Sequence, residues 1–142
     1  MQYQVDLFQY IKKRRWKKKF PNEKACRNFL FQHRWPNGFK CPKCNNTHFY
    51  MISKRNLYEC SYCHHQTSLI AGTIMHKTRV PLRKWFKAIC ILVNQKNKIT
   101  AAALSKTLGV TKPTGWLLKK KIEKAKDDPD TLDFILKIAE VE

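Results

Sequence analysis

The stretch Cys41-Pro42-Lys43-Cys44 and its counterpart Cys60-Ser61-Tyr62-Cys63 decide how this chain folds. Each holds two cysteines two residues apart, and fifteen residues separate the two pairs. This spacing predicts one tetrahedral zinc site with four thiolate ligands, because a two-residue spacer lets both sulfurs of a pair reach the same ion. Four protein ligands leave no open position, so the Zn2+ is expected to be structural rather than catalytic. The alternative is a set of ordinary buried or disulfide-bonded cysteines. The predicted ligands are Cys41, Cys44, Cys60 and Cys63.

The segments around the two cysteine pairs predict short strands. Residues 47–52 form one strand candidate, residues 54–56 a turn, residues 57–59 the returning strand, and residues 66–70 a third strand. Phe39 is expected to lead as a short strand into Cys41. Three histidines close to the cysteines are expected to be surface groups or neighbours of the ligands, since four cysteines already complete a tetrahedron. These are His48, His64 and His65.

A helix is predicted before the two cysteine pairs, and a pattern typical of a helix-turn-helix follows them. Asn22 is a plausible cap for the first helix, and Asn37-Gly38 favours a tight turn after it. After Pro81, apolar residues recur at helical spacing. Thr100 and Thr111 are then expected to cap two further helices, with Gly109 ending the first of them. The fold class is therefore a small α+β fold, with a four-cysteine zinc ribbon of short antiparallel strands, a helix before it and a three-helix helix-turn-helix unit after it. An ordinary helical hairpin would share much of this last pattern.

Basic residues indicate where nucleic acid would bind. In a major groove, the early residues of the helix after Thr111 would face base edges, and its lysines would face phosphates. The block of residues 12–19 is almost entirely cationic and would neutralise phosphates without reading sequence. Trp16 within it would either stack on a base or lie against the domain, and Gly115 would allow close helix–helix or helix–DNA approach. The candidate DNA contacts are Lys112, Thr114, Trp116, Lys119, Lys120, Lys13, Arg14 and Arg15.

Charge divides the chain unevenly. The net charge is +19, and residues 1–126 hold 28 of the 29 Lys and Arg side chains. A basic body of this kind predicts a polyanionic partner, most simply double-stranded DNA, although a merely soluble basic protein is the alternative. The amino terminus has no pattern of a secretory signal, and the longest apolar run, residues 88–93, is too short to span a membrane. We therefore expect no membrane partner and a cytoplasmic location.

The expected division of the chain follows these patterns. Residues 1–20 form a basic segment, residues 21–75 a helix with the zinc ribbon, and residues 80–126 the helix-turn-helix domain. Residues 127–142 are expected to be an acidic linker, with a short helix over residues 131–139. The aspartates at residues 127–130 are interpreted as this linker rather than as a metal-dependent catalytic site.

Several of these motifs, taken in order, resemble one family. Residues 29–44 (FLFQHRWPNGFKCPKC), 60–85 (CSYCHHQTSLIAGTIMHKTRVPLRKW) and 108–116 (LGVTKPTGW) are similar to the zinc-ribbon insertion-sequence transposases of bacteria that carry an ISXO-type DDE catalytic domain. The resemblance implies that the four cysteines hold zinc and that the helices after Pro81 bind the terminal repeats of the element. It also implies a nucleoid location for the bound protein.

In that family a ribonuclease-H-like domain supplies three acidic residues that hold two divalent metals. Residues 139–142 look like the entry into its first strand, so no catalytic residue is assigned and this chain is not expected to be an enzyme by itself. A full-length transposase is a possible partner. Two alternatives stay open. The chain would be half of an active transposase completed by a separately encoded or frameshifted part, or a transcription-type zinc ribbon that contacts RNA polymerase or another protein.

Overall fold

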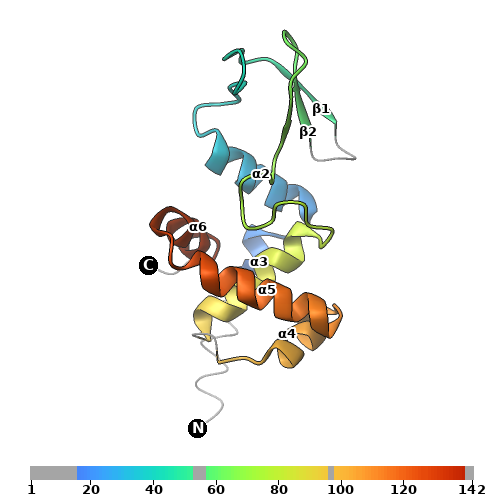
Figure 1. The fold of residues 1–142 in the computed structure, drawn as a ribbon, viewed down its shortest axis with the longest axis vertical. Helices are drawn as coiled ribbons and strands as arrows, with labels where there is room; N and C mark the ends of the chain where they lie inside the picture. Colours follow the sequence, from blue (N-terminus) through green and yellow to red (C-terminus); the bar gives the residue numbers. More distant parts are fainter. Residues whose placement is uncertain (1–15, 53–56, 96–97, 140–142) are drawn as a thin grey trace. The chain divides into compact units, whose positions relative to one another are not determined.

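The computed structural model describes residues 16–52, 57–95 and 98–139 (Figure 1). The chain forms two compact units. One unit contains residues 26–79, and the other combines the segment before residue 26 with the residues from Val80 onward. The sequence also predicts a short helix over residues 5–11. This segment, the predicted turn at residues 54–56 and the candidate contacts Lys13, Arg14 and Arg15 lie outside the described residues.

The unit of residues 26–79 contains a three-stranded antiparallel sheet in the order β1-β2-β3. The strands are β1 (Phe49–Ile52), β2 (Leu57–Cys60) and β3 (Gln66–Ser68). Tyr58 at the centre pairs with Met51 on one side and Thr67 on the other. The three predicted strands are confirmed, and the predicted fold class of a small α+β protein with it.

An aromatic cluster covers one face of this sheet. α2 (Glu23–Arg34) delivers Phe31, whose ring lies 5.3 Å from that of Tyr58. Phe39 is 3% exposed, with its ring 4.9 Å from those of Trp35 and Phe49. The prediction that Phe39 begins a strand is wrong, because residues 39 and 40 have no regular structure and the Phe39 ring serves as a core residue. The predicted turn is present, since Gly38 has φ 94° and its N–H donates to the Trp35 carbonyl.

The other unit is helical, and its core lies along α3. It contains α3 (Leu82–Asn94), α4 (Ala101–Leu108), α5 (Lys112–Ala125) and α6 (Pro129–Ala139). The buried side of α3 carries four of the six apolar residues expected from the spacing, while Cys90 and Val93 are only partly buried, and α4, α5 and α6 all pack against this helix. Its buried residues are Leu82, Trp85, Phe86, Ala88, Ile89 and Leu92.

α4 and α5 begin at the predicted capping residues, and α4 ends at the predicted glycine. The Thr100 side chain accepts a hydrogen bond from Ala103 N at 3.1 Å, and the Thr111 side chain accepts one from Thr114 N at 3.4 Å. Gly109 has φ 71° and φ in this region suits glycine, so α4 ends there and the chain can turn tightly into α5. α4 and α5 therefore form the two helices of a helix-turn-helix.

α6 completes this core from the acidic end of the chain. Asp128 caps α6 by accepting a hydrogen bond from Thr131 N at 3.3 Å. The buried residues of α6 are Phe134, Ile135, Ile138 and Ala139, and the helix packs against α3. Residues 129–139 are thus a packed helix in the same compact unit as α3 to α5, where the sequence suggested a linker followed by a helix.

The residues before α2 also belong to the helical unit. Residues 16–19 are helical, and Trp16 is 4% exposed. The Arg83 guanidinium lies 5.4 Å from the centre of the Trp16 ring, and the Phe20 ring meets Phe86 edge-on at 4.8 Å. Of the two interpretations of Trp16, the structure favours packing against the domain. Over the described ranges, no helix combines the length and apolarity needed to cross a membrane.

Candidate functional site

The two Cys-x-x-Cys segments adopt the same turn, which turns both sulfurs of each segment toward one point. Asn45 N donates to the Cys41 carbonyl at 2.9 Å, and His64 N donates to the Cys60 carbonyl at 3.0 Å. Asn45 and His64, each directly after the second cysteine, have φ of 67° and 62°. The repeated geometry indicates two equivalent zinc knuckles.

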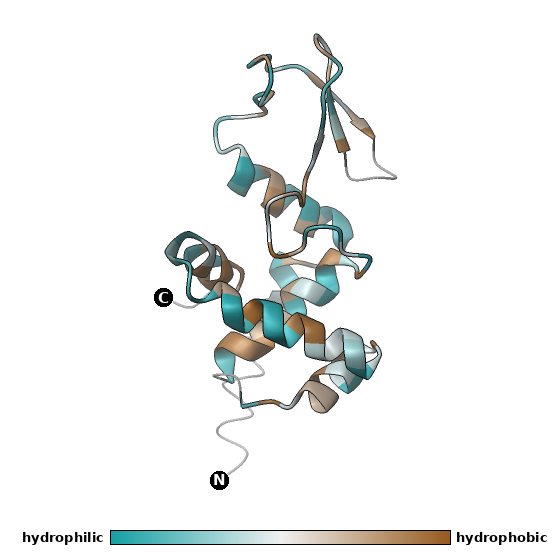
Figure 2. Ribbon diagram, in the orientation of Figure 1, coloured by the Kyte–Doolittle hydropathy of each residue, from teal (hydrophilic) through white to brown (hydrophobic). Residues whose placement is uncertain are grey.

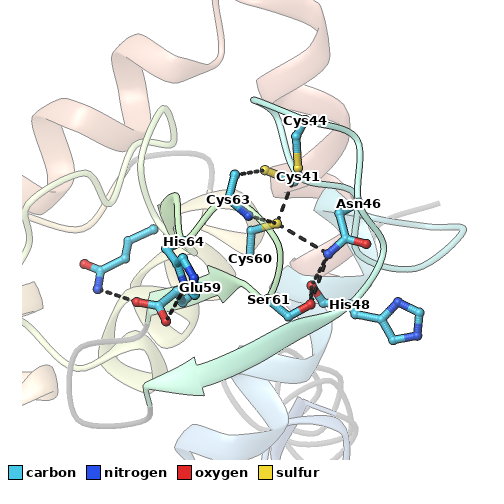
Figure 3. A network of polar contacts seen from close by, with 10 residues as sticks. Cys41, Cys44, Asn46, His48, Glu59, Cys60, Ser61, Cys63 and His64 are labelled. Carbon is cyan, nitrogen blue, oxygen red and sulfur yellow. Dashed lines mark hydrogen bonds and ion pairs between the residues drawn. The ribbon is translucent and has the colours of Figure 1, made fainter.

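The four sulfurs gather into one cluster (Figure 3). Their Sγ atoms all lie within 4.8 Å of one another, and the pairs Cys41–Cys63 and Cys44–Cys60 are 3.6 and 3.4 Å apart. A zinc ion with four bonds of about 2.3 Å would place its sulfurs about 3.8 Å apart, so the cluster fits a tetrahedral ion. None of the six cysteines is in a disulfide. The donor set and spacing are those of one structural Zn2+.

Hydrogen bonds favour the thiolate form at Cys60. Desolvation opposes ionisation of this thiol, but N–H groups of Cys63 and Asn46 directed at the sulfur lower its pKa to about 5. At Cys44 the backbone N–H of Asn46 lowers the pKa, whereas desolvation and the other three thiols raise it, with a net result of about 12. Neighbouring thiols without a cation cannot all ionise, and a bound Zn2+ would remove this conflict.

Asn46 links the two knuckles behind the sulfurs. Its side-chain Nδ2 donates to Cys60 Sγ at 3.5 Å, to Ser61 Oγ at 3.1 Å and to the His48 carbonyl at 3.2 Å. Figure 3 shows Asn46 and Ser61 beside the cysteines. Asn46 is not among the residues predicted from the sequence. Its position two residues after a ligand, with an amide side chain, was the signal available for it.

The three histidines near the ligands are exposed, in agreement with their expected role as surface groups. His64 Nδ1 lies 3.7 Å from Glu59 Oε2, on the outside of the ribbon. Among the described residues, the only group of three or more side chains placed to hold a metal is the set of four cysteines.

The candidate DNA contacts on α5 differ in their environments. Lys112 and Lys120 are exposed, and the Trp116 side chain is 52% exposed with the Lys120 ammonium 4.7 Å from its ring centre. Lys119 is partly buried and pairs with Glu123 at 3.8 Å. The Thr114 hydroxyl lies 2.9 Å from that of Thr111, inside the helix cap. The structure thus gathers Lys112, Trp116 and Lys120 on the open side of α5, and ties Thr114 and Lys119 into local contacts.

Gly115 belongs to the contact between α4 and α5. A Cβ atom added there would lie 2.7 Å from the side chain of Ser105 and 3.0 Å from the Ala101 carbonyl. Of the two interpretations of this glycine, close helix–helix approach is the one that the geometry supports.

Comparison with known proteins supports the assignment of a zinc ribbon. Residues 21–66 match the family of transposase zinc-ribbon domains. An uncharacterized protein in transposable element ISH50 of Halobacterium salinarum is 32% identical in an alignment of 87 residues that covers 58% of this chain and 29% of that relative. The chain thus spans less than a third of that relative. No solved structure matches the chain. The resemblance found in the sequence is confirmed for the zinc ribbon.

Proposed function

We propose that this chain, with its transposase zinc-ribbon domain, is a DNA-binding part of an insertion-sequence transposase that recognises the terminal repeats of its element. The observation that carries the proposal is the helix-turn-helix of α4 and α5, in which the second helix presents lysines on its open side. A helix of this kind fits the major groove, where phosphates line both walls. The match of residues 21–66 to a transposase ribbon supports the same partner.

In this proposal, different residues of α5 contact the phosphates and the base edges of the DNA. Lys112 and Lys120 neutralise phosphates, and Lys119 does so from its pair with Glu123. Trp116 faces base edges from the first half of the helix. Thr114 faces them from the cap that it shares with Thr111, so its hydroxyl acts both in the cap and at the groove. Lys13, Arg14 and Arg15 add contacts to the backbone without reading sequence.

The zinc ribbon is proposed to have a structural role. The four predicted ligands are Cys41, Cys44, Cys60 and Cys63, and a closed set of thiolates offers no position for substrate. The ion supplies folding free energy to a sheet of three short strands. Zinc removal would therefore unfold the ribbon rather than stop a chemical step.

We place the DNA cutting and joining chemistry outside residues 1–142. Two of the acidic side chains near residue 130 have local partners: Asp128 caps α6, and Asp133 pairs with Lys137 at 3.0 Å. Under this proposal the helix-turn-helix domain spans residues 80–126 and the chain competes with a full-length transposase for repeat DNA. Its place of action is then the nucleoid of a bacterial cytoplasm.

A gel shift with zinc-loaded chain tests the proposal. The probes are duplexes that carry the terminal repeats of the element encoding the chain, and shuffled duplexes of the same composition. We expect tighter binding to the repeats and no strand cleavage when Mg2+ is added. Equal binding to both duplexes would contradict recognition and favour a ribbon that contacts a protein. Cleavage by the chain alone would overturn the proposal that the cutting and joining chemistry lies outside residues 1–142.

A further inference from the structure

Exposed large apolar side chains gather in two places in the part of the chain that the structure describes. Four of them belong to the ribbon, and the other two are Trp116 and Leu117 on α5, which are 52% and 45% exposed. Figure 2 shows brown, hydrophobic stretches among teal, hydrophilic ones along α5. Two adjacent apolar residues on an otherwise lysine-rich helix surface suggest a ligand with both negative charge and an apolar group.

The helical repeat places this pair opposite the core. Gly115, Leu118, Ile122 and Ala125 are the buried residues of α5, and they lie on one side of the helix. At 3.6 residues per turn, Trp116 and Leu117 fall on the other side, on either flank of Lys120. The apolar pair is therefore in the middle of the exposed face, with a lysine ammonium between its two members.

The charge of α5 indicates whether its exposed face binds a second copy of the chain or a DNA duplex. The helix holds five lysines and one acid, and that acid, Glu123, pairs with Lys119. A second copy of the same face would bring the lysines of two chains together, which costs free energy. A duplex instead supplies phosphates to the lysines and, at base edges of the major groove, one apolar group, the C5-methyl of thymine.

We propose that Leu117, with Trp116 beside it, reads a thymine methyl group in the major groove of the terminal repeat. The inference rests on the proposed function and adds to it a specificity-determining residue. The Lys120 ammonium lies 4.7 Å from the centre of the Trp116 ring, so one face of that ring already has a cation over it. Leu117, which is 45% exposed, is the smaller of the two side chains and is the one assigned to meet a methyl group.

Thymine-to-uracil substitution tests the inference, because it removes only the methyl group. The full zinc-loaded chain is titrated with repeat duplexes in which each thymine in turn is replaced by deoxyuridine, and Kd is measured by fluorescence anisotropy at fixed salt. At one or two positions we expect wild-type binding to weaken about fourfold, the effect of one buried methyl-sized group. Leu117→Ala should bind the thymine and uracil duplexes equally. Met51→Ala, which removes an exposed apolar side chain of the ribbon, is the matched control and should keep the fourfold difference.

Two outcomes would distinguish failure of the inference about Leu117 from failure of the proposed function. A chain that prefers repeat to shuffled DNA, but is insensitive to every uracil or keeps its sensitivity in Leu117→Ala, would overturn this inference and leave the proposed function standing. A chain without preference for the repeat would overturn both. Sedimentation of the free chain adds a third result: a dimer that Leu117→Ala dissolves would show that the face binds protein, and would also overturn the inference.

Discussion

At the scale of single residues, the zinc knuckles depend on one backbone conformation that few side chains tolerate. Asn45 and His64 both have φ near +65° and each follows the second cysteine of its knuckle. Asparagine enters this left-handed region readily, and a β-branched residue does so only with strain. Both positions thus hold the sulfurs in place although neither side chain is a ligand.

Replacement of Asn45 tests this point. Asn45→Gly should retain zinc as the wild type does, because glycine adopts positive φ at no steric cost. Asn45→Val should destabilise the ribbon by about 1–2 kcal/mol and speed the loss of zinc. Transfer of zinc to a chromogenic chelator measures the rate. Equal rates for the two variants would contradict a conformational role for this residue.

Asn46 provides a second prediction at this scale, because its side chain donates to a ligand sulfur and to the opposite knuckle. Asn46→Ala should weaken zinc affinity about 10- to 100-fold, as loss of groups behind the ligands does in other metal sites. A competitive chelator titration gives the affinity, and Asn37→Ala in an exposed turn is the control. Unchanged affinity in Asn46→Ala would show that the bonds seen behind Cys60 do not support the metal.

At the scale of elements, the two helices of the helix-turn-helix approach each other over a single glycine. Gly115 costs α5 about 1 kcal/mol of helix propensity relative to alanine. The added Cβ would nevertheless collide with Ser105 at 2.7 Å. Gly115→Ala should therefore lower the free energy of unfolding by about 1–3 kcal/mol, the usual cost of overpacking.

A double-mutant cycle gives the decisive reading for this contact. Ser105→Gly removes the two nearest atoms that the new Cβ would meet and leaves the Ala101 carbonyl at 3.0 Å, so the double variant should be more stable than the sum of the single changes implies. Urea denaturation supplies the three free energies. Strictly additive effects would mean that Gly115 is needed for a reason other than its distance to α4.

The start of α3 is held by a residue from another helix. Pro81 precedes α3 and offers no side-chain cap, while the Glu23 carboxylate accepts hydrogen bonds from Leu82 N at 3.1 Å and Arg83 N at 2.6 Å. Glu23→Ala should destabilise the helical unit by about 1–2 kcal/mol, because it removes a cap and a negative charge at a helix N-terminus. Thermal unfolding followed by circular dichroism measures this loss. Glu59→Ala, on the ribbon, is the control, and an equal effect of both changes would contradict the capping role.

At the scale of the whole molecule, lysines in the basic part of the chain and lysines in the acidic last segment are expected to contribute differently to DNA binding. Lys112→Ala on α5 should reduce the slope of log K against log salt by about 1, because one phosphate contact is lost. Lys137→Ala on α6 should leave the slope unchanged, since this lysine pairs with Asp133. Binding titrations at several salt concentrations measure both slopes. Identical slopes for the two variants would argue against a defined DNA face.

The parts of the fold that the sequence predicted are those set by neighbours along the chain. Cysteine spacing, the caps at Thr100 and Thr111 and the glycine at residue 109 each act within a few residues, and all appear in the structure. Contacts between distant residues were not predictable in this way. Nothing near Glu23 indicates that it caps a helix beginning at Leu82, and nothing near Phe39 distinguishes a core ring from a strand.

The same limit applies to the candidate site. The four ligands follow from spacing, whereas Asn46 depends on how the second knuckle folds back onto the first. On α5, helical spacing predicts that Leu118, Ile122 and Ala125 face inward, and the structure buries them, whereas the pairing of Lys119 with Glu123 and the exposure of Leu117 needed the structure. Local patterns therefore identified the metal site and the helices, and tertiary packing showed which side chains of α5 are exposed.

The central claim is that α5 reads repeat DNA, and one ratio tests it most directly. The quantity is Kd for the shuffled duplex divided by Kd for the terminal-repeat duplex, measured at fixed salt for the zinc-loaded chain and for Trp116→Ala. We expect a ratio well above one for the wild type and a ratio close to one for the variant, with both proteins folded and holding zinc. A ratio of one for the wild type, or an unchanged ratio in Trp116→Ala, would contradict the claim.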